Sequence, residues 1–217
     1  MSTRVAQVLL GLTSVLAVVA ANAVPQGQTA PGTDAAWLPL FDGKTLTSWV
    51  PSKFFRPGDV TVENGQIVLE AGNSLTGITW AGPPLPTSDY ELALEAMRVE
   101  GSDFFAGVTF PVGDSYCSLI LGGWGGNVVG LSSINGMDAS ENDTSQSMTF
   151  DSKRWYGVRI RVTAARIEAW LDDRQIISQD LKGNTVDIRI EVEPSRPLGI
   201  ASYRTKSALR GLRLRRL

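Results

Sequence analysis

Chemistry in this 217-residue chain must rest on groups other than imidazole, because the sequence contains no histidine. That absence excludes Ser-His-Asp and Cys-His catalysis and histidine-bound zinc. Acid–base work must then use carboxylates, lysine, arginine or tyrosine, or an oxygen-ligated cation. Asp103 is the most suggestive carboxylate, because it enters the apolar run 104–108, where burial can raise a carboxylate's proton affinity. It could act as a general base, or it could cap a turn together with Ser102.

A second acidic group lies in residues 137–144, which include Asp138, Glu141 and Asp143. Glu141 could supply a catalytic base, and Asp138 could accept hydrogen bonds from sugar hydroxyls. Oxygen ligands alone could also bind calcium, although the spacing does not match an EF-hand loop. The remaining alternative is an ordinary solvated polar loop.

Trp124 is framed by two glycine pairs in the sequence Gly-Gly-Trp-Gly-Gly. Glycine lets a backbone approach a ligand closely, and an indole face stacks well on a sugar ring. The alternative is a tight turn with Trp124 folded into the core. A phosphate-binding loop is not indicated, because neither a lysine nor the start of a helix follows.

The elements that must position these residues are short strands. Residues 90–99 alternate with period two, and we expect a strand there although their composition also suits a helix. Residues 155–163 and 166–171 predict a hairpin, and Asp172-Asp173 turns the chain into 175–178. Residues 197–203 and 208–217 are expected to form the last pair of strands. Many short strands at this spacing predict an all-β, two-sheet antiparallel sandwich.

The N-terminus has the pattern of a secretory leader. Residues 1–4 are positively charged, residues 8–21 are almost wholly apolar, and Ala21-Asn22-Ala23 is an A-x-A cleavage site. The apolar run is shorter than the ~20 residues of a membrane-spanning helix. We therefore expect a signal peptide at 1–23, a flexible lead-in at 24–36, a single domain at 37–217, and a periplasmic or secreted protein.

Composition narrows the class of partner. The chain carries 20 basic and 22 acidic residues, which argues against binding to nucleic acid and, for the mature form, against binding to a membrane surface. The exception is the basic tail 210–216, whose alternation with leucines predicts a half-exposed final strand. Cys117 is the only cysteine, so no intrachain disulfide forms. We interpret it as core filler rather than as a nucleophile.

Four segments carry a resemblance to a known family: L-F-D-G-K-T-L-x-x-W at 40–49, and residues 62–68, 155–160 and 209–214. Together they resemble the bacterial 3-keto-disaccharide hydrolase domain family, formerly a domain of unknown function. The resemblance covers nearly all of the expected mature chain. It implies a concanavalin A-like jelly roll in which the first and last strands pair and one sheet is concave.

The resemblance also implies a reaction. A glycoside that is already oxidised to a ketone at its third carbon loses the neighbouring proton to a base, the leaving sugar departs by elimination, and water adds to the double bond. Asp103 or Glu141 would be the base, while Trp124 and Asp138 would contact the sugar. Arg204 would bind the enolate oxygen or a hydroxyl, or would be an ordinary rim charge. No cofactor is expected, with calcium as the one alternative.

The middle of the chain departs from the family pattern. The family has a string resembling N-S-G-apolar-apolar-R, followed by a strand with Glu and Gln. In this chain Phe110 and Pro111 stand where the arginine is expected, and residues 116–119 lack the Glu and Gln. Two alternatives to the enzyme therefore stay open: a non-catalytic carbohydrate-binding module, and a structural or adhesive sandwich resembling laminin-G domains.

Overall fold

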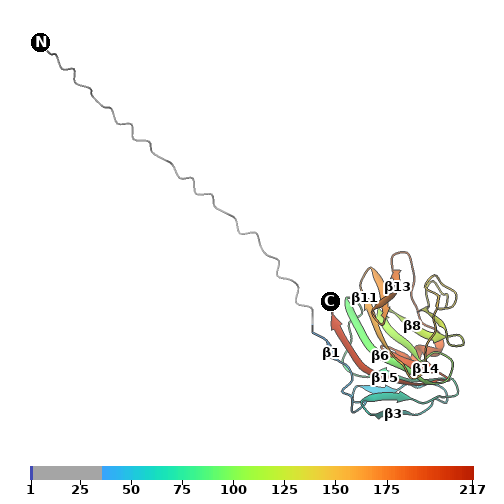
Figure 1. Ribbon diagram of the computed structural model, residues 1–217. Helices are drawn as coiled ribbons and strands as arrows, with labels where there is room; N and C mark the ends of the chain where they lie inside the picture. The colour runs from blue at the N-terminus through green and yellow to red at the C-terminus, as the bar shows by residue number, and fades with distance from the viewer. Residues whose placement is uncertain (2–35) are drawn as a thin grey trace. The chain divides into compact units, whose positions relative to one another are not determined.

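The structure, a computed structural model, describes Met1 and residues 36–217. The expected cleavage site before Val24 and nearly all of the lead-in lie outside the described residues. Residues 38–217 form two antiparallel β-sheets that pack face to face (Figure 1). Within the described part, no helix is long and apolar enough to cross a membrane. The expected all-β jelly-roll sandwich is confirmed.

Strands that are neighbours in a sheet are mostly distant in the sequence. The eight-stranded sheet runs β13 (Arg174–Asp180), β12 (Arg166–Leu171), β11 (Trp155–Val162), β6 (Tyr90–Glu100), β15 (Lys206–Arg216), β4 (Gln66–Leu69) and β3 (Val60–Glu63). Its eighth strand, β1 (Leu38–Pro39), pairs with β15 beside this path. The seven-stranded sheet runs β10 (Gln146–Ser147), β9 (Val128–Ser132), β8 (Ser115–Gly123), β7 (Ala106–Val112), β14 (Gly199–Tyr203), β5 (Leu75–Trp80) and β2 (Trp49–Pro51).

The two ends of the domain meet in one sheet. Strand β1 (Leu38–Pro39) pairs with β15, with Leu38 opposite Leu214, and the Leu40 amide donates to the Leu212 carbonyl at 2.8 Å. In Figure 1 the chain's C-terminus accordingly lies close to β1. The expected pairing of the first and last strands is confirmed.

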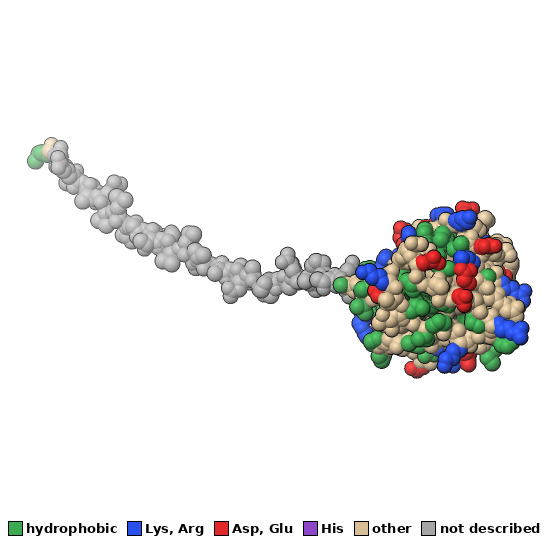
Figure 2. Space-filling view, turned by 90° about the horizontal axis from the view of Figure 1, so that it is seen from below, with side chains coloured by type: hydrophobic (Ala, Val, Ile, Leu, Met, Phe, Trp, Pro, Cys, Tyr) green, Lys and Arg blue, Asp and Glu red, His purple; other side chains and the backbone are tan. Residues whose placement is uncertain are grey.

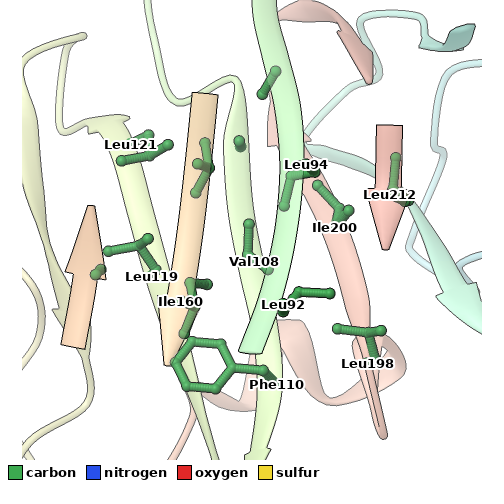
Figure 3. Packing of buried hydrophobic residues seen from close by; sticks show 14 of the residues in the cluster. Leu92, Leu94, Val108, Phe110, Leu119, Leu121, Ile160, Leu198, Ile200 and Leu212 are labelled. Atoms are coloured by element: carbon green, nitrogen blue, oxygen red, sulfur yellow. The ribbon is translucent and has the colours of Figure 1, made fainter. Parts of the chain in front are cut away.

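The core lies between the sheets and follows the period-two alternation of the strands. Leu92, Leu94 and Ile160 from the eight-stranded sheet point toward Val108 and Leu119 of the other (Figure 3). Because successive strand residues face opposite ways, their neighbours point outward on both sides of the sandwich. Each sheet thus has an outer face whose side chains do not pack in the core.

Residues 90–99 form a strand, as expected, although glutamate, leucine, alanine and methionine all favour a helix. Strand β6 is hydrogen-bonded on both sides, to β11 and to β15. A central position in a sheet satisfies every backbone group and buries Tyr90, Leu92, Leu94 and Ala96 together. Tertiary packing therefore overrides intrinsic propensity.

The expected pairing of residues 197–203 with 208–217 is wrong. Strand β14 pairs with β5 and β7, while β15 pairs with β4 and β6 in the opposite sheet. Arg204, with φ of 47°, lies where the chain passes from one sheet to the other. The two strands thereby supply apolar side chains to the core from opposite sides, which a hairpin within one sheet could not do.

Two segments lie against the outer face of the seven-stranded sheet. One contains the 3₁₀ helix η1 (Ile190–Ser195), where the Pro194 carbonyl accepts a hydrogen bond of 2.6 Å from the Thr79 hydroxyl of β5. The other follows β9, and its Ser133 amide donates to the Asp187 carbonyl at 2.6 Å. Figure 2 shows one side of the molecule, where acidic and basic side chains are interspersed with hydrophobic ones, in keeping with the nearly balanced charge.

Candidate functional site: a cavity on the outer face of the seven-stranded sheet

A cavity of about 370 Å³ opens on the outer face of the seven-stranded sheet. Its floor comes from strand residues that alternate with core residues of β8 and β9. Its walls come from loops that are distant in sequence. The lining residues are Ser74, Leu75, Asp103, Phe104, Ser118, Ile120, Trp124, Ser132, Arg189, Glu191, Val192 and Tyr203.

Trp124 projects from a tight turn at the end of β8 and is 44% exposed. The Gly126 amide donates to the Gly123 carbonyl at 3.1 Å, and Trp124 has φ of 48°, a left-handed conformation that side chains other than glycine rarely adopt. Such strain persists only where the surroundings impose it, and it clusters at functional sites. The exposure of the Trp124 side chain excludes the alternative of a tryptophan folded into the core.

The Trp124 turn is held from both sides. Asp103 Oδ2 accepts a hydrogen bond of 3.2 Å from the Gly125 amide. On the other side, the Arg98 guanidinium donates to the Gly126 carbonyl at 3.0 Å. A Cβ atom on Gly126 would lie 2.5 Å from the Ser102 carbonyl oxygen, so only glycine allows this close approach. The indole is thus presented on a fixed backbone rather than on a free loop.

Arg98 is an unusual component of this support because it comes from the core side of β6. Its guanidinium lies 5.3 Å from the centre of the Phe105 ring and 5.9 Å from that of Phe150. Burial lowers the pKa of Arg98, and the negative charge of Asp103 opposes that effect. Arg98 and Asp103 thus support the same turn, Arg98 through the Gly126 carbonyl and Asp103 through the Gly125 amide.

Asp103 itself is half-buried and well oriented. Its Oδ1 accepts a hydrogen bond of 2.7 Å from the Phe104 amide, and its own amide donates to the Thr205 hydroxyl at 3.2 Å. An ionised carboxylate offers about four acceptor sites, so acceptor capacity remains for a ligand. Asp103 therefore holds a turn through its hydrogen bonds and also lines the cavity, while its role as a general base stays a prediction.

The cavity lining also includes an ion network centred on Arg189, just before η1. The guanidinium donates to both carboxylate oxygens of Glu191, at 2.9 and 3.2 Å, and also binds Asp138. Hydrogen bonding to Arg189 lowers the pKa of Glu191, and the same bonds raise the pKa of Arg189. Ser132, on the cavity floor, donates to Asp138 at 3.3 Å.

Arg189 and Glu191 were not predicted from the sequence. They lie in an alternating stretch with no motif, and the partner Asp138 is 51 residues from Arg189.

The remaining predicted residues lie at the edge of the cavity or outside it. Asp138 contributes through Arg189, whereas Glu141 is exposed and does not line the cavity. Arg204 also does not line it: its side chain donates to the Asn73 carbonyl at 3.0 Å and lies 5.2 Å from the ring of Tyr203. It thus supports the rim, where Tyr203 stacks on Phe104 at 5.9 Å between ring centres.

The positions that differ from the family pattern lie in the same sheet. Phe110 and Cys117 face the core and are fully buried, while Thr109 and Ser118 face outward and share a hydrogen bond of 2.8 Å. Burial raises the pKa of the Cys117 thiol to about 12, so the thiolate that a nucleophile needs is not formed at neutral pH.

Within residues 36–217, no three His, Cys, Asp or Glu side chains gather closely enough to hold a metal ion. Calcium binding by residues 137–144 stays a prediction. The cavity combines an exposed indole, an ion-paired guanidinium, two carboxylates and a phenol, which are groups that stack on and hydrogen-bond to a sugar.

The model of the 3-keto-alpha-glucoside-1,2-lyase-like domain family matches residues 36–215. The chain belongs to this family. The resemblance to 3-keto-disaccharide hydrolases seen in the sequence is thereby confirmed. No curated protein matches the chain.

Solved structures with the same fold include a candidate glycosyl hydrolase from Parabacteroides distasonis, with 14% identity, coverage of 83% of this chain and 94% of that chain, and a TM-score of 0.52. The carbohydrate-binding module CBM66 from Bacillus subtilis has 14% identity, coverage of 78% and 96%, and a TM-score of 0.51. The Crh5 transglycosylase in complex with NAG has 10% identity, coverage of 84% and 85%, and a TM-score of 0.57. At these identities the likeness shows the fold alone.

Proposed function

We propose that this protein is an exported enzyme that cleaves 3-keto-glycosides in the cavity on the outer face of the seven-stranded sheet. The observation that carries the proposal is that Asp103, Trp124 and the ion-paired Arg189 line one cavity. Membership of the family supports the choice of a 3-keto sugar as substrate. The exposed indole supports a carbohydrate ligand in general.

Asp103 would remove the proton from the carbon between the ketone and the glycosidic carbon. The electron pair of that C–H bond then forms the enolate, whose negative oxygen needs a positive or hydrogen-bonding partner. Arg189 is the cavity-lining cation, so we assign this role to Arg189 rather than to Arg204. The enolate expels the leaving sugar, whose oxygen takes a proton, and water then adds across the resulting double bond.

The proton for the leaving oxygen can come from two cavity residues. Tyr203 is a phenol at the rim, stacked against Phe104 beside Asp103. Glu191 is the other acid, but its paired state with Arg189 lowers its pKa and keeps it ionised at neutral pH. Tyr203 is therefore our choice for the general acid.

The test is incubation of the protein lacking residues 1–23 with 3-keto-glucosides, followed by mass spectrometry of free 3-keto-glucose. We expect release with the wild type and with Glu141→Gln, whose carboxylate lies outside the cavity, and release slowed by about 10²–10⁴-fold with Asp103→Asn. Binding of the sugar without release would favour a binding module instead. The export part is tested separately by N-terminal sequencing of protein from the producing cell, where Val24 is expected and an intact Met1 would contradict it.

A non-catalytic carbohydrate-binding module is the second candidate, and one observation favours it. Both oxygens of Asp103 already accept backbone hydrogen bonds, one of them from the Trp124 turn, so the carboxylate has a structural use without any chemistry. In that case Asp103→Asn would weaken sugar binding by loosening the turn, and no variant would change turnover, because there would be none.

A further inference from the structure

A second depression, of about 430 Å³, lies on the outer face of the eight-stranded sheet. The core lies between this face and the cavity described above, so the two openings are on opposite sides of the sandwich. The floor lies over β6 and β11, and the walls come from neighbouring strands and the start of the domain. The lining residues are Trp37, Ala93, Leu94, Glu95, Trp155, Gly157, Val158, Arg159, Trp170, Asp172, Asp173 and Arg213.

Gly157, on the floor, has no packing reason to be glycine. A Cβ atom there would meet only Asp172 Oδ1, at 3.7 Å, and the residue lies within strand β11. By contrast, a Cβ atom on Gly130 would lie 2.8 Å from a backbone oxygen, and one on Gly199 would lie 2.6 Å from one. A glycine inside a strand weakens it and often marks the close approach of a ligand. Gly157 keeps the depression open at a cost to strand stability.

Three tryptophans surround this floor, and each is held by a guanidinium. The Arg159 guanidinium carbon lies 3.7 Å from the ring centre of Trp170, and that of Arg210 lies 4.1 Å from the ring centre of Trp155. Two further arginines lie over Trp37, at 4.8 and 5.1 Å. Cation–π contacts of this kind fix the rings in place. Fixed indoles around an open floor form a platform for stacking flat apolar surfaces.

Three of these arginines, Arg159, Arg210 and Arg215, are themselves paired with acids. Glu91 has 0% of its side chain exposed and contacts Arg159, Arg161 and Arg215 at 2.7–3.0 Å. Burial alone would raise the pKa of Glu91, but hydrogen bonds from Arg161 and Arg215 outweigh burial and lower it. Glu95 pairs with Arg210 in the same way, at 2.8 Å. Glu91 and Glu95 therefore balance part of the positive charge on this face.

The charges that line the depression are of both signs. Asp172 and Asp173 occupy the β12–β13 turn with φ of 48° and 64°, and both line the depression together with Arg159 and Arg213. Asp172 is itself paired with Arg154 at 2.6 Å. Alternating acceptors and donors match hydroxyl groups, which both donate and accept. The carboxylates would repel a polyanion, and the guanidinium groups would repel a polycation. The chemistry fits a neutral, hydroxyl-rich chain.

We propose that the depression around Gly157 binds a neutral polysaccharide chain, with pyranose rings stacked on the tryptophans. This would be a second carbohydrate site, separate from the cavity with Asp103. It would hold the protein on a polymer while the opposite face acts on, or binds, a small sugar.

The test is native affinity electrophoresis of the protein lacking residues 1–23, in gels containing β-glucan, dextran, mannan or xylan. We expect at least one of these neutral polymers to retard the wild type. Gly157→Gln should abolish the retardation, because its side chain fills the depression while Trp155 and Trp170 stay in place. Trp170→Ala should weaken binding by about tenfold, the loss typical of one stacking platform.

Three variants separate this proposal from the proposed function. Trp124→Ala and Asp103→Asn change only the opposite face and should be retarded like the wild type, while Gly157→Gln should keep its melting temperature and its activity on 3-keto-glucosides. The proposal is overturned if no neutral polymer retards the wild type, if Gly157→Gln is retarded equally, or if only an anionic polymer such as polygalacturonate causes retardation.

Discussion

The outer faces of the two sheets differ in what lies against them. On the seven-stranded sheet, η1 and the segment after β9 approach so closely that Gly130 and Gly199 have no room for a side chain. On the eight-stranded sheet, Gly157 has room, and the face is formed by tryptophans and arginines of the strands themselves and by Trp37. On the seven-stranded sheet, η1 and the segment after β9 form walls around a cavity, which suits the binding of a small ligand. A sheet face with stacked rings suits a long, repetitive ligand.

The largest expected effect is on catalysis in the cavity of the seven-stranded sheet. Asp103→Asn should lower kcat on 3-keto-glucosides by about 10²–10⁴-fold, the usual contribution of a general base. Sugar binding should also weaken slightly, because an amide cannot accept hydrogen bonds from both the Phe104 and Gly125 amides. Glu141→Gln is the matched control and should leave kcat unchanged. An equal loss of kcat in both variants would mean that Asp103 is not the general base.

The next effect compares the two kinds of glycine directly. Gly199→Ala should destabilise the protein by about 1–3 kcal/mol, because the new methyl group meets the backbone of Ser195. Gly157→Ala should be neutral or stabilise by about 0.4–1 kcal/mol, because alanine restricts the unfolded chain more than glycine does. Urea denaturation of both variants measures this difference. Equal destabilisation would mean that Gly157 is structural after all.

A smaller effect concerns the indole at the cavity. Trp124→Ala should weaken sugar binding by about 1–3 kcal/mol, by analogy with other aromatic stacking platforms. Alanine is chosen over glycine because Trp124 has a left-handed backbone conformation, which is strained for alanine as it is for tryptophan but not for glycine. Isothermal titration with a glucoside measures the loss, and Phe55→Ala, an exposed aromatic outside the cavity, is the control. An unchanged affinity would place the sugar elsewhere.

The smallest effect concerns acid stability on the open face. Hydrogen bonds from arginines lower the folded-state pKa of Glu91 and of Glu95 below the ordinary 4.5. A lowered pKa contributes stability above the unfolded-state value, and that stability is lost as the pH falls through the folded-state value. The melting temperature should therefore drop below pH 4.5, with a shallower slope in Glu95→Gln. An identical slope in that variant would contradict the assignment.

Local patterns were sufficient for most of the fold. Residues 155–162 alternate so regularly that the buried and outward faces of β11 could be read directly, and the turn at Asp172-Asp173 followed from its composition. The pairing of residues 197–203 with 208–217 failed because a strand pattern records which residues face the core, not which sheet the strand joins. Arg204 redirects the chain there, and no sequence rule marks it.

The site was predictable only in part, for the same physical reason. A glycine-framed tryptophan and a carboxylate at the edge of an apolar run signal exposure and reactivity locally, so Trp124 and Asp103 could be named in advance. Arg189 and Glu191 gain their importance from contacts with Asp138 and with the cavity, across long sequence separations. Glu141 had the right chemical type in the right segment, but the loop turns it outward.

The sequence by itself determined the family, the all-β architecture and the exclusion of histidine chemistry, because residue types and period-two alternation are local properties. Only the tertiary structure decided that Asp103, Trp124 and Arg189 line one cavity, and that three tryptophans surround Gly157 on the opposite side. Those relations depend on which strands become neighbours, and strand order is set by the burial of the whole core rather than by any one segment.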